Sequence, residues 1–192
     1  MATSASRVVA LLRGINVGGK NVLPMRDLMA ICTELGHRDV RTYLQSGNVV
    51  FVPRTGRIAR DQLDADAALA DELALAIATR TGLSVPIVVR RHDELVAALA
   101  ANPFDRDAPP NTRHVMFLSE EPPASAIELL DPRRSPPDEF VVIGRDVHLR
   151  LPNGSARSKL TVAWFERSLG VIATARNWNT VGALAELSVN PG

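Results

Sequence analysis

The chain has 192 residues, of which 46% are hydrophobic, and its 22 basic and 21 acidic side chains give a formal net charge of +1. This length fits one large domain or two small ones, with enough apolar residues to bury a core. The balanced charge argues against a protein that coats nucleic acid or an anionic membrane by bulk charge. A single cysteine, Cys32, excludes an internal disulfide and a cysteine-rich zinc site.

The sequence predicts neither a membrane span nor a secretory signal. No apolar run approaches the roughly 20 residues that cross a bilayer. The short apolar stretch near the N-terminus, between Arg7 and Arg13, is typical of a buried first strand. We therefore expect a cytoplasmic protein that does not associate with membranes.

The first half of the chain predicts the element order β-α-β-β-α-β. Apolar runs indicate strands, amphipathic or alanine-rich stretches indicate helices, and glycines mark the helix ends. In chain order the expected elements are a strand at 7–13, a helix at 24–35, strands at 39–45 and 48–52, a helix at 60–81 and a strand at 84–90. Pro86 lacks a backbone donor, so we expect the last strand at an edge of the sheet.

The second half predicts the same order after a linking helix at 92–101 and a Pro- and Asp-rich connector. The expected elements are a strand at 113–119, a helix at 125–130, strands at 139–143 and 146–151, a helix at 157–169, a strand at 170–175 and a last helix at 178–187. Alternation along 146–151 places Val147 and Leu149 inward and His148 outward, in solvent.

This repeated order predicts an α+β protein made of two ferredoxin-like halves, with an extra linking helix and a C-terminal helix. We expect the first half at 1–90, the linking helix and connector at 91–112, and the second half with its C-terminal helix at 113–192. The duplication concerns the order of elements, because the sequence shows no repeat of individual residues.

Right-handed crossovers predict which loops share an end of each sheet. In the first half, the polar loop 14–21 and the hairpin 46–48 should lie side by side. In the second half, the loops 152–159 and 176–180 should lie at one end. Each half should therefore carry one polar cluster.

The first polar loop, Arg13 to Asn21, contains several glycines and one of only two lysines, Lys20. It nearly matches a phosphate-binding P-loop, but Asn21 replaces the hydroxyl that would hold magnesium, and the expected helix begins too late to cap a phosphate. Backbone N–H groups beside a lysine can bind anions in a looser arrangement. The alternative is a tight glycine turn with a solvated Lys20.

Two loops of the second half carry similar chemistry. Loop 153–159 is expected to open a helix, where Lys159 and a serine hydroxyl could hold an anion, or where a serine could simply cap the helix. Farther along the chain, Arg176 and Trp178 offer a planar charge and a stacking face for a ring. Alternatively, Trp178 packs between the halves while Asn177 and Asn179 hold the turn.

No catalytic or metal-binding arrangement stands out in the sequence. None of the four histidines has the spacing of a metal-ligand pair, and no nucleophile-elbow motif is present. We expect no metal and no cofactor, and the sequence leaves open whether the protein is an enzyme.

Five segments together resemble a bacterial family known as the domain of unknown function 1697. They are RGINVGGKN (13–21), YLQSGNVVF (43–51), NPF (102–104), SKL (158–160) and TARNWNTV (174–181). The resemblance extends from Arg7 to Leu187 and implies two α+β halves of ferredoxin-like type. It implies no activity.

These features favour a binding module for a phosphate-bearing ligand, a nucleotide or a nucleic-acid segment, at one or both polar clusters. A transferase or hydrolase acting on a phosphorylated compound is one alternative, and a protein-interaction module with purely structural loops is another. The candidate ligand-binding residues are Arg13, Asn16, Gly18, Gly19, Lys20, Asn21, Ser46, Asn48, Ser158, Lys159, Arg176, Asn177, Trp178 and Asn179.

Overall fold

The computed structural model describes residues 6–54, 61–104 and 108–189 of the chain. Its internal contacts divide the chain into two compact units. One contains the chain up to Leu95 and again from Leu184 onward, and the other comprises Val96–Ala183. The division falls inside two helices, so neither helix belongs wholly to one unit. The limits expected at residues 90 and 112 stay predictions.

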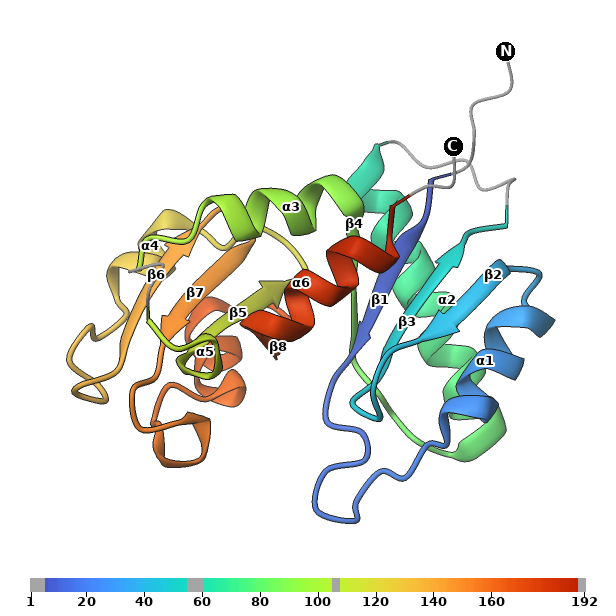
Figure 1. The fold of residues 1–192 in the computed structure, drawn as a ribbon, viewed down its shortest axis with the longest axis horizontal. Helices are drawn as coiled ribbons and strands as arrows, with labels where there is room; N and C mark the ends of the chain where they lie inside the picture. The colour runs from blue at the N-terminus through green and yellow to red at the C-terminus, as the bar shows by residue number, and fades with distance from the viewer. Residues whose placement is uncertain (1–5, 55–60, 105–107, 190–192) are drawn as a thin grey trace. The chain divides into compact units, whose positions relative to one another are not determined.

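The first unit contains a four-stranded antiparallel sheet with the strand order β2-β3-β1-β4 (Figure 1). Its elements are β1 (Val8–Leu12), α1 (Met25–Glu34), β2 (Arg38–Thr42), β3 (Asn48–Val52), α2 (Gln62–Thr81) and β4 (Ile87–Arg91). Pro86 directly precedes β4, which lies at an edge of the sheet as the missing proline donor predicts. Arg60, the expected first residue of α2, lies outside the described residues.

Helices α1 and α2 cover the same face of this sheet. Leu28 and Cys32 of α1 and Leu73 of α2 belong to one buried cluster with Ala10 and Leu12 of β1. The apolar spacing predicted for α1 therefore forms the core, as expected from a stripe with helical periodicity. Burial raises the pKa of the Cys32 thiol to about 12, which makes this cysteine a packing residue.

The second unit repeats this arrangement with the strand order β6-β7-β5-β8. Its elements are β5 (Arg113–Leu118), α4 (Ala124–Glu128), β6 (Glu139–Ile143), β7 (Asp146–Arg150), α5 (Val162–Leu169) and β8 (Ala173–Asn177). Met116, Val147 and Phe165 lie in its buried cluster. The linking helix α3 (His92–Ala100) follows β4, and the last helix α6 (Trp178–Leu187) follows β8. Residues 105–107 of the expected connector lie outside the described residues.

The boundaries of α5 and β8 differ from the sequence prediction. Helix α5 begins at Val162, because the Thr161 side chain accepts a hydrogen bond from the Trp164 backbone N–H and caps the helix there. The preceding Ser155–Arg157 form a short 3-10 turn. Gly170 ends α5 in the left-handed conformation, and β8 follows at Ala173, later than expected.

Arg90 in β4 and Arg176 in β8 occupy equivalent positions in the two sheets. Each is the register partner of a valine in the neighbouring strand, Val9 in β1 and Val115 in β5. Each donates from Nη1 to the carbonyl oxygen of the residue before it, at 3.0 and 2.8 Å respectively. The duplication expected from the order of elements therefore extends to a pair of residues.

His148 corrects one prediction from the sequence. The alternation along β7 is right, since Val147 and Leu149 contribute to the core cluster. However, His148 is 1% exposed and not solvated. The opposite face of the sheet is covered at His148, whereas its register partner Val141 on β6 is exposed, and alternation alone does not reveal this difference.

Candidate functional site

The first polar loop folds back on itself as a small hairpin. The Lys20 N–H donates to the Val17 carbonyl oxygen at 3.1 Å, and Gly18 and Gly19 between them have φ values of +58° and +72°. Glycine adopts this left-handed conformation without a steric penalty. Lys20 is exposed next to this turn.

Asn16 ties this loop to the neighbouring hairpin of β2 and β3. Its side-chain amide donates to the carbonyl oxygens of Leu23 at 2.9 Å and Gln45 at 2.7 Å, and its Oδ1 accepts from the Leu23 N–H at 2.9 Å. The Leu12 N–H also donates to the Gly47 carbonyl oxygen at 2.8 Å. The loop and the hairpin thus lie side by side, which confirms the topological prediction.

The amide side chains in this first cluster bind the backbone of the loops themselves. Asn21 donates to the Gly14 carbonyl oxygen at 3.0 Å. Asn48, which is buried, donates to the Tyr43 carbonyl oxygen at 2.8 Å and to the Ser46 hydroxyl at 3.0 Å. These contacts give Asn16, Asn21 and Asn48 a structural role, whereas the Lys20 side chain extends into solvent.

The second polar cluster forms at the end of the sheet where β7 and β8 end and β5 begins. Arg113, the first residue of β5, pairs in register with Arg150 at the end of β7. The next residue, His114, pairs with Asn177 at the end of β8. The loops that follow β7 and β8 therefore start from the same end of the sheet, as expected.

Several candidate residues of this cluster hold the local backbone. The Asn177 side chain accepts a hydrogen bond from the Thr180 N–H at 2.8 Å and so caps α6. The Ser158 hydroxyl accepts from the Leu160 N–H at 3.0 Å. The sequence predicted that loop 153–159 opens a helix, and this prediction was wrong, because the helix is capped later, at Thr161. The side chains of Lys159 and Asn179 are exposed.

Arg176 is buried within the second unit. It is 8% exposed and donates from Nη1 to the Thr174 hydroxyl, at 2.8 Å, as well as to the backbone. Burial lowers the pKa of Arg176 to about 10, so the guanidinium stays charged at neutral pH.

Arg113 and Trp178 form a feature that the sequence analysis missed. The guanidinium carbon of Arg113 lies 4.6 Å from the centre of the Trp178 ring, within the range of a cation–π interaction. Arg113 is 6% exposed, and its Nε is buried without a hydrogen bond to any residue that the structure describes. A buried N–H donor without an acceptor is costly, and the Nε of Arg113 is such a donor.

The same two residues line a cavity of about 540 Å³, within the usual size range of small-molecule sites. Its other walls come from the end of α3 and the segment after it, and they are Val96, Leu99, Ala100 and Asn102. The Asn102 amide is engaged locally, because it donates to the Phe104 carbonyl oxygen at 3.0 Å. Arg113 therefore supplies the charge in a cavity whose lining is both polar and apolar.

Two features of the sequence are consistent with a site at this position. Arg113 is a charged residue at the start of a strand, RHVMFL, whose last four residues are apolar. The cavity also unites two of the quoted family segments, since Asn102 belongs to NPF and Trp178 to TARNWNTV. Segments far apart in the chain meet there, and neither segment by itself identifies Arg113.

Within residues 6–54, 61–104 and 108–189, no three His, Cys, Asp or Glu side chains lie close enough together to hold a metal ion. Over the same ranges no helix is both long and apolar enough to cross a membrane.

The fold defines the class of the protein as α+β with two four-stranded antiparallel sheets. Its family follows from comparison with known proteins. The chain belongs to the family described as Protein of unknown function (DUF1697), which matches residues 5–148. The segments SKL and TARNWNTV lie beyond the matched range.

A solved structure shares the fold. It is that of a conserved bacterial protein from Streptococcus pneumoniae, which is 21% identical, has a TM-score of 0.70, and aligns over 96% of this chain and 99% of its own. At this identity the likeness concerns the fold alone. No curated protein matches the chain.

Proposed function

We propose that this protein is a binding module for a small phosphate-bearing ligand, held by Arg113 in the cavity beside Trp178. The observation that carries the proposal is the buried guanidinium, whose Nε has no acceptor among the described residues. A guanidinium presents parallel N–H donors that match two oxygens of a phosphate. A phosphate in the cavity would offset the buried positive charge of Arg113.

The cavity walls favour a ligand that also has an apolar or aromatic part. Val96, Leu99 and Ala100 supply aliphatic surface, and the half-buried Trp178 supplies an aromatic edge. Because one face of the indole is covered by Arg113, the cation also holds the tryptophan in place. A nucleotide or another ring-bearing phosphate has both parts.

The remaining candidate residues have supporting roles in this proposal. Lys159, Asn179 and the buried Arg176 are charged or polar groups of the second cluster, where they add positive potential or donors near the same end of the sheet. In the first cluster, Lys20 and Arg13 stay proposed phosphate contacts, with Gly18 and Gly19 providing the open turn between them. Asn16, Asn21, Ser46 and Asn48 would shape that loop and not contact ligand.

We also infer that each half has the ferredoxin-like arrangement. The order β-α-β-β-α-β together with the strand orders β2-β3-β1-β4 and β6-β7-β5-β8 supports this inference. In this arrangement the proposed site would lie at the end of the second sheet where β5, one of its two central strands, begins.

A thermal-shift panel tests the proposed function directly. Inorganic phosphate, phenyl phosphate, adenosine monophosphate and benzoate would be titrated into the full chain and into the Arg113→Met and Arg133→Met variants. Arg133 is exposed in a loop of the same unit and serves as the matched control. A ligand at 100 times its Kd should add about 2.7 kcal/mol to the unfolding free energy, a shift of several degrees.

The expected result is stabilisation by phenyl phosphate or adenosine monophosphate that Arg113→Met abolishes and Arg133→Met retains. An equal shift in Arg113→Met and the native protein would refute the assignment of Arg113. Stabilisation by benzoate but by neither phosphate ester would show that the ligand is a carboxylate.

A further inference from the structure

Two loops of the second unit, 131–138 and 153–160, are joined to each other by hydrogen bonds. The Nε of Arg134 donates to the Lys159 carbonyl oxygen at 3.1 Å. The Lys159 N–H donates in turn to the hydroxyl of the buried Ser135 at 3.0 Å. The two loops therefore hold each other in place without a ligand, and such preorganisation lowers the entropic cost of binding.

Four basic side chains gather on these loops. They are called the basic loop cluster and are Arg133, Arg134, Arg157 and Lys159. None of the four forms an ion pair with any residue that the structure describes. Both acids of the loops are engaged locally, because Asp131 accepts from the Arg133 N–H at 2.9 Å and Asp138 accepts from the Ser135 hydroxyl at 2.7 Å. The positive charge of the cluster is therefore available to a partner.

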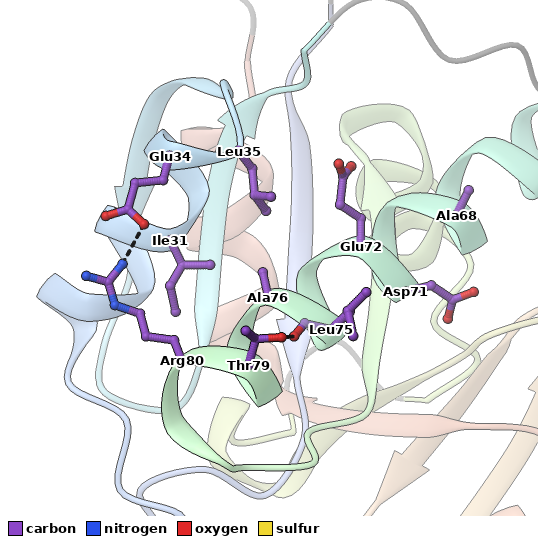
Figure 2. A pocket seen from close by; sticks show the side chains of 10 residues that line it. All are labelled: Ile31, Glu34, Leu35, Ala68, Asp71, Glu72, Leu75, Ala76, Thr79 and Arg80. Carbon is purple, nitrogen blue, oxygen red and sulfur yellow. Dashed lines mark hydrogen bonds and ion pairs between the residues drawn. The ribbon is translucent and has the colours of Figure 1, made fainter.

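The groove between α1 and α2 shows the contrasting arrangement, in which carboxylates are matched by arginines. This groove has a volume of about 820 Å³. Glu34 pairs with Arg80 at 2.7 Å across it (Figure 2), and Glu72 pairs with Arg54 at 3.1 Å. The basic loop cluster lacks such internal partners among the described residues, so its charge indicates an anionic ligand.

Arg134 presents a planar guanidinium on an aromatic support. Its guanidinium carbon lies 4.7 Å from the centre of the Trp164 ring. Trp164 is packed in turn against Phe140 and Phe165, whose ring centres lie 5.9 and 4.6 Å away. A guanidinium plane held in this way can stack on a nucleobase, whereas an acidic side chain has no ring to place there.

We propose that the basic loop cluster binds the phosphate backbone of a single-stranded nucleic acid. Arg133, Arg157 and Lys159 would contact successive phosphates, and Arg134 would stack on a base. Such surfaces bind without reading the sequence, because every nucleotide has a phosphate and every base has a π-face. A local cluster agrees with the net charge of only +1, since binding by bulk charge is not required. The proposal does not depend on the cavity beside Trp178.

Fluorescence anisotropy with the full chain tests the proposal, using a labelled oligouridine of about 15 nucleotides, which covers one site of a typical single-strand-binding domain. Titrations at about 0.05 M and about 0.2 M salt give the salt slope, because each phosphate contact releases about 0.7 counterions from a single strand. The variants are Arg133→Met, Arg157→Met and Lys159→Met. The matched control is Arg167→Met, because Arg167 is also exposed but lies in the last turn of α5, outside both loops.

The expected result is binding that weakens about 20- to 50-fold between the two salt concentrations, as about three or four phosphate contacts require. Each of the three loop variants should weaken binding about five- to tenfold at about 0.05 M salt and reduce the salt slope by about 0.7. Arg167→Met should change neither quantity. Absence of binding to oligouridine, or an unchanged salt slope in all three loop variants, would overturn the proposal.

Two further measurements distinguish this surface from the proposed cavity site and from a protein partner. Arg113→Met should bind oligouridine with the native salt slope, whereas Arg133→Met should still be stabilised by adenosine monophosphate. Binding of oligouridine that requires Arg113 and none of the loop residues would overturn the proposal for the basic loop cluster but not the one for the cavity. A polyglutamate peptide of equal length that binds as tightly through the same loop residues would also overturn it, since the partner would then be an acidic protein segment.

Discussion

The guanidinium of Arg113 lies over the ring of Trp178, with 4.6 Å between the guanidinium carbon and the ring centre. Arg113 begins β5, and Trp178 begins α6. This contact therefore joins the start of the central strand to the start of the last helix. It also presents a buried cation to a cavity of about 540 Å³.

Replacement of Arg113 by lysine separates the charge of this residue from its planar shape. Arg113→Lys keeps the positive charge but loses the planar stacking and the parallel donors. We expect the unfolding free energy to fall by about 0.5–1 kcal/mol, and the affinity for phenyl phosphate to fall about tenfold. Chemical denaturation and calorimetric titration measure the two effects. Arg150→Lys, at the register partner on β7, should change neither quantity by a comparable amount.

A substitution at Gly47 tests how closely the β2–β3 hairpin approaches the first loop. A Cβ at this position would lie 2.7 Å from the Leu12 Cβ and 2.8 Å from the Ile15 Cδ1, and the residue has a φ of +77°. Both overpacking and backbone strain should act, so Gly47→Ala should cost about 2–4 kcal/mol in a urea titration. Gly18→Ala, also at positive φ but in open space, should cost only about 1 kcal/mol. Similar losses in both variants would contradict the close approach.

Variants of Asn16 and Lys20 distinguish a structural role from a ligand-binding role in the first polar cluster. Asn16→Ala removes the hydrogen bonds to Leu23 and Gln45 and places alanine at a φ of +55°. We expect a loss of about 2–3 kcal/mol in unfolding free energy. Lys20→Ala should stay within about 0.5 kcal/mol of the native protein, because the side chain is exposed. A large destabilisation by Lys20→Ala would instead assign this lysine a structural role.

The buried His148 should lower the free energy of unfolding of the protein in mild acid. Burial lowers the pKa of its imidazole, and neither ring nitrogen has a hydrogen-bond partner among the described residues. Below the unfolded-state pKa of about 6.5, the unfolded chain takes up a proton that the folded chain refuses. The free energy of unfolding should therefore fall as the pH drops through 6.5, by up to about 1.4 kcal/mol per pH unit for this group.

The variant His148→Leu isolates this contribution. Burial also lowers the pKa values of His37 and His114, so the native protein should show their combined effect. Urea titration from pH 8 to pH 5 would measure the unfolding free energy of both proteins. The value for the native protein minus the value for His148→Leu should decrease as the pH falls. A pH-independent difference would show that His148 titrates normally in the folded state.

Local patterns predicted most of the fold. The apolar stripe of α1, the glycines that end α1 and α2, and the proline before β4 act through neighbouring residues, so the sequence contains their effect directly. The start of α5 was missed because two capping signals compete there. Ser155 begins a 3-10 turn and Ser158 follows it, whereas Thr161 caps the helix.

The candidate site was predictable only in part. The end of the sheet that carries the second cluster follows from topology and lies where expected. Trp178 was a candidate from its motif, and it lines the cavity. Arg176 was the expected partner of a ligand ring, yet it is buried and donates to Thr174. Arg113, one strand away, has the buried guanidinium that faces the cavity.

By itself, the sequence determines the order of the elements, the edge position of β4 and the sheet end at which each polar loop lies. These properties follow from backbone chemistry and from the fixed hand of crossovers. The burial of Arg113 and His148 required the folded chain. Alternation along a strand tells which face a side chain occupies, but whether that face meets water depends on segments distant in sequence that pack against it.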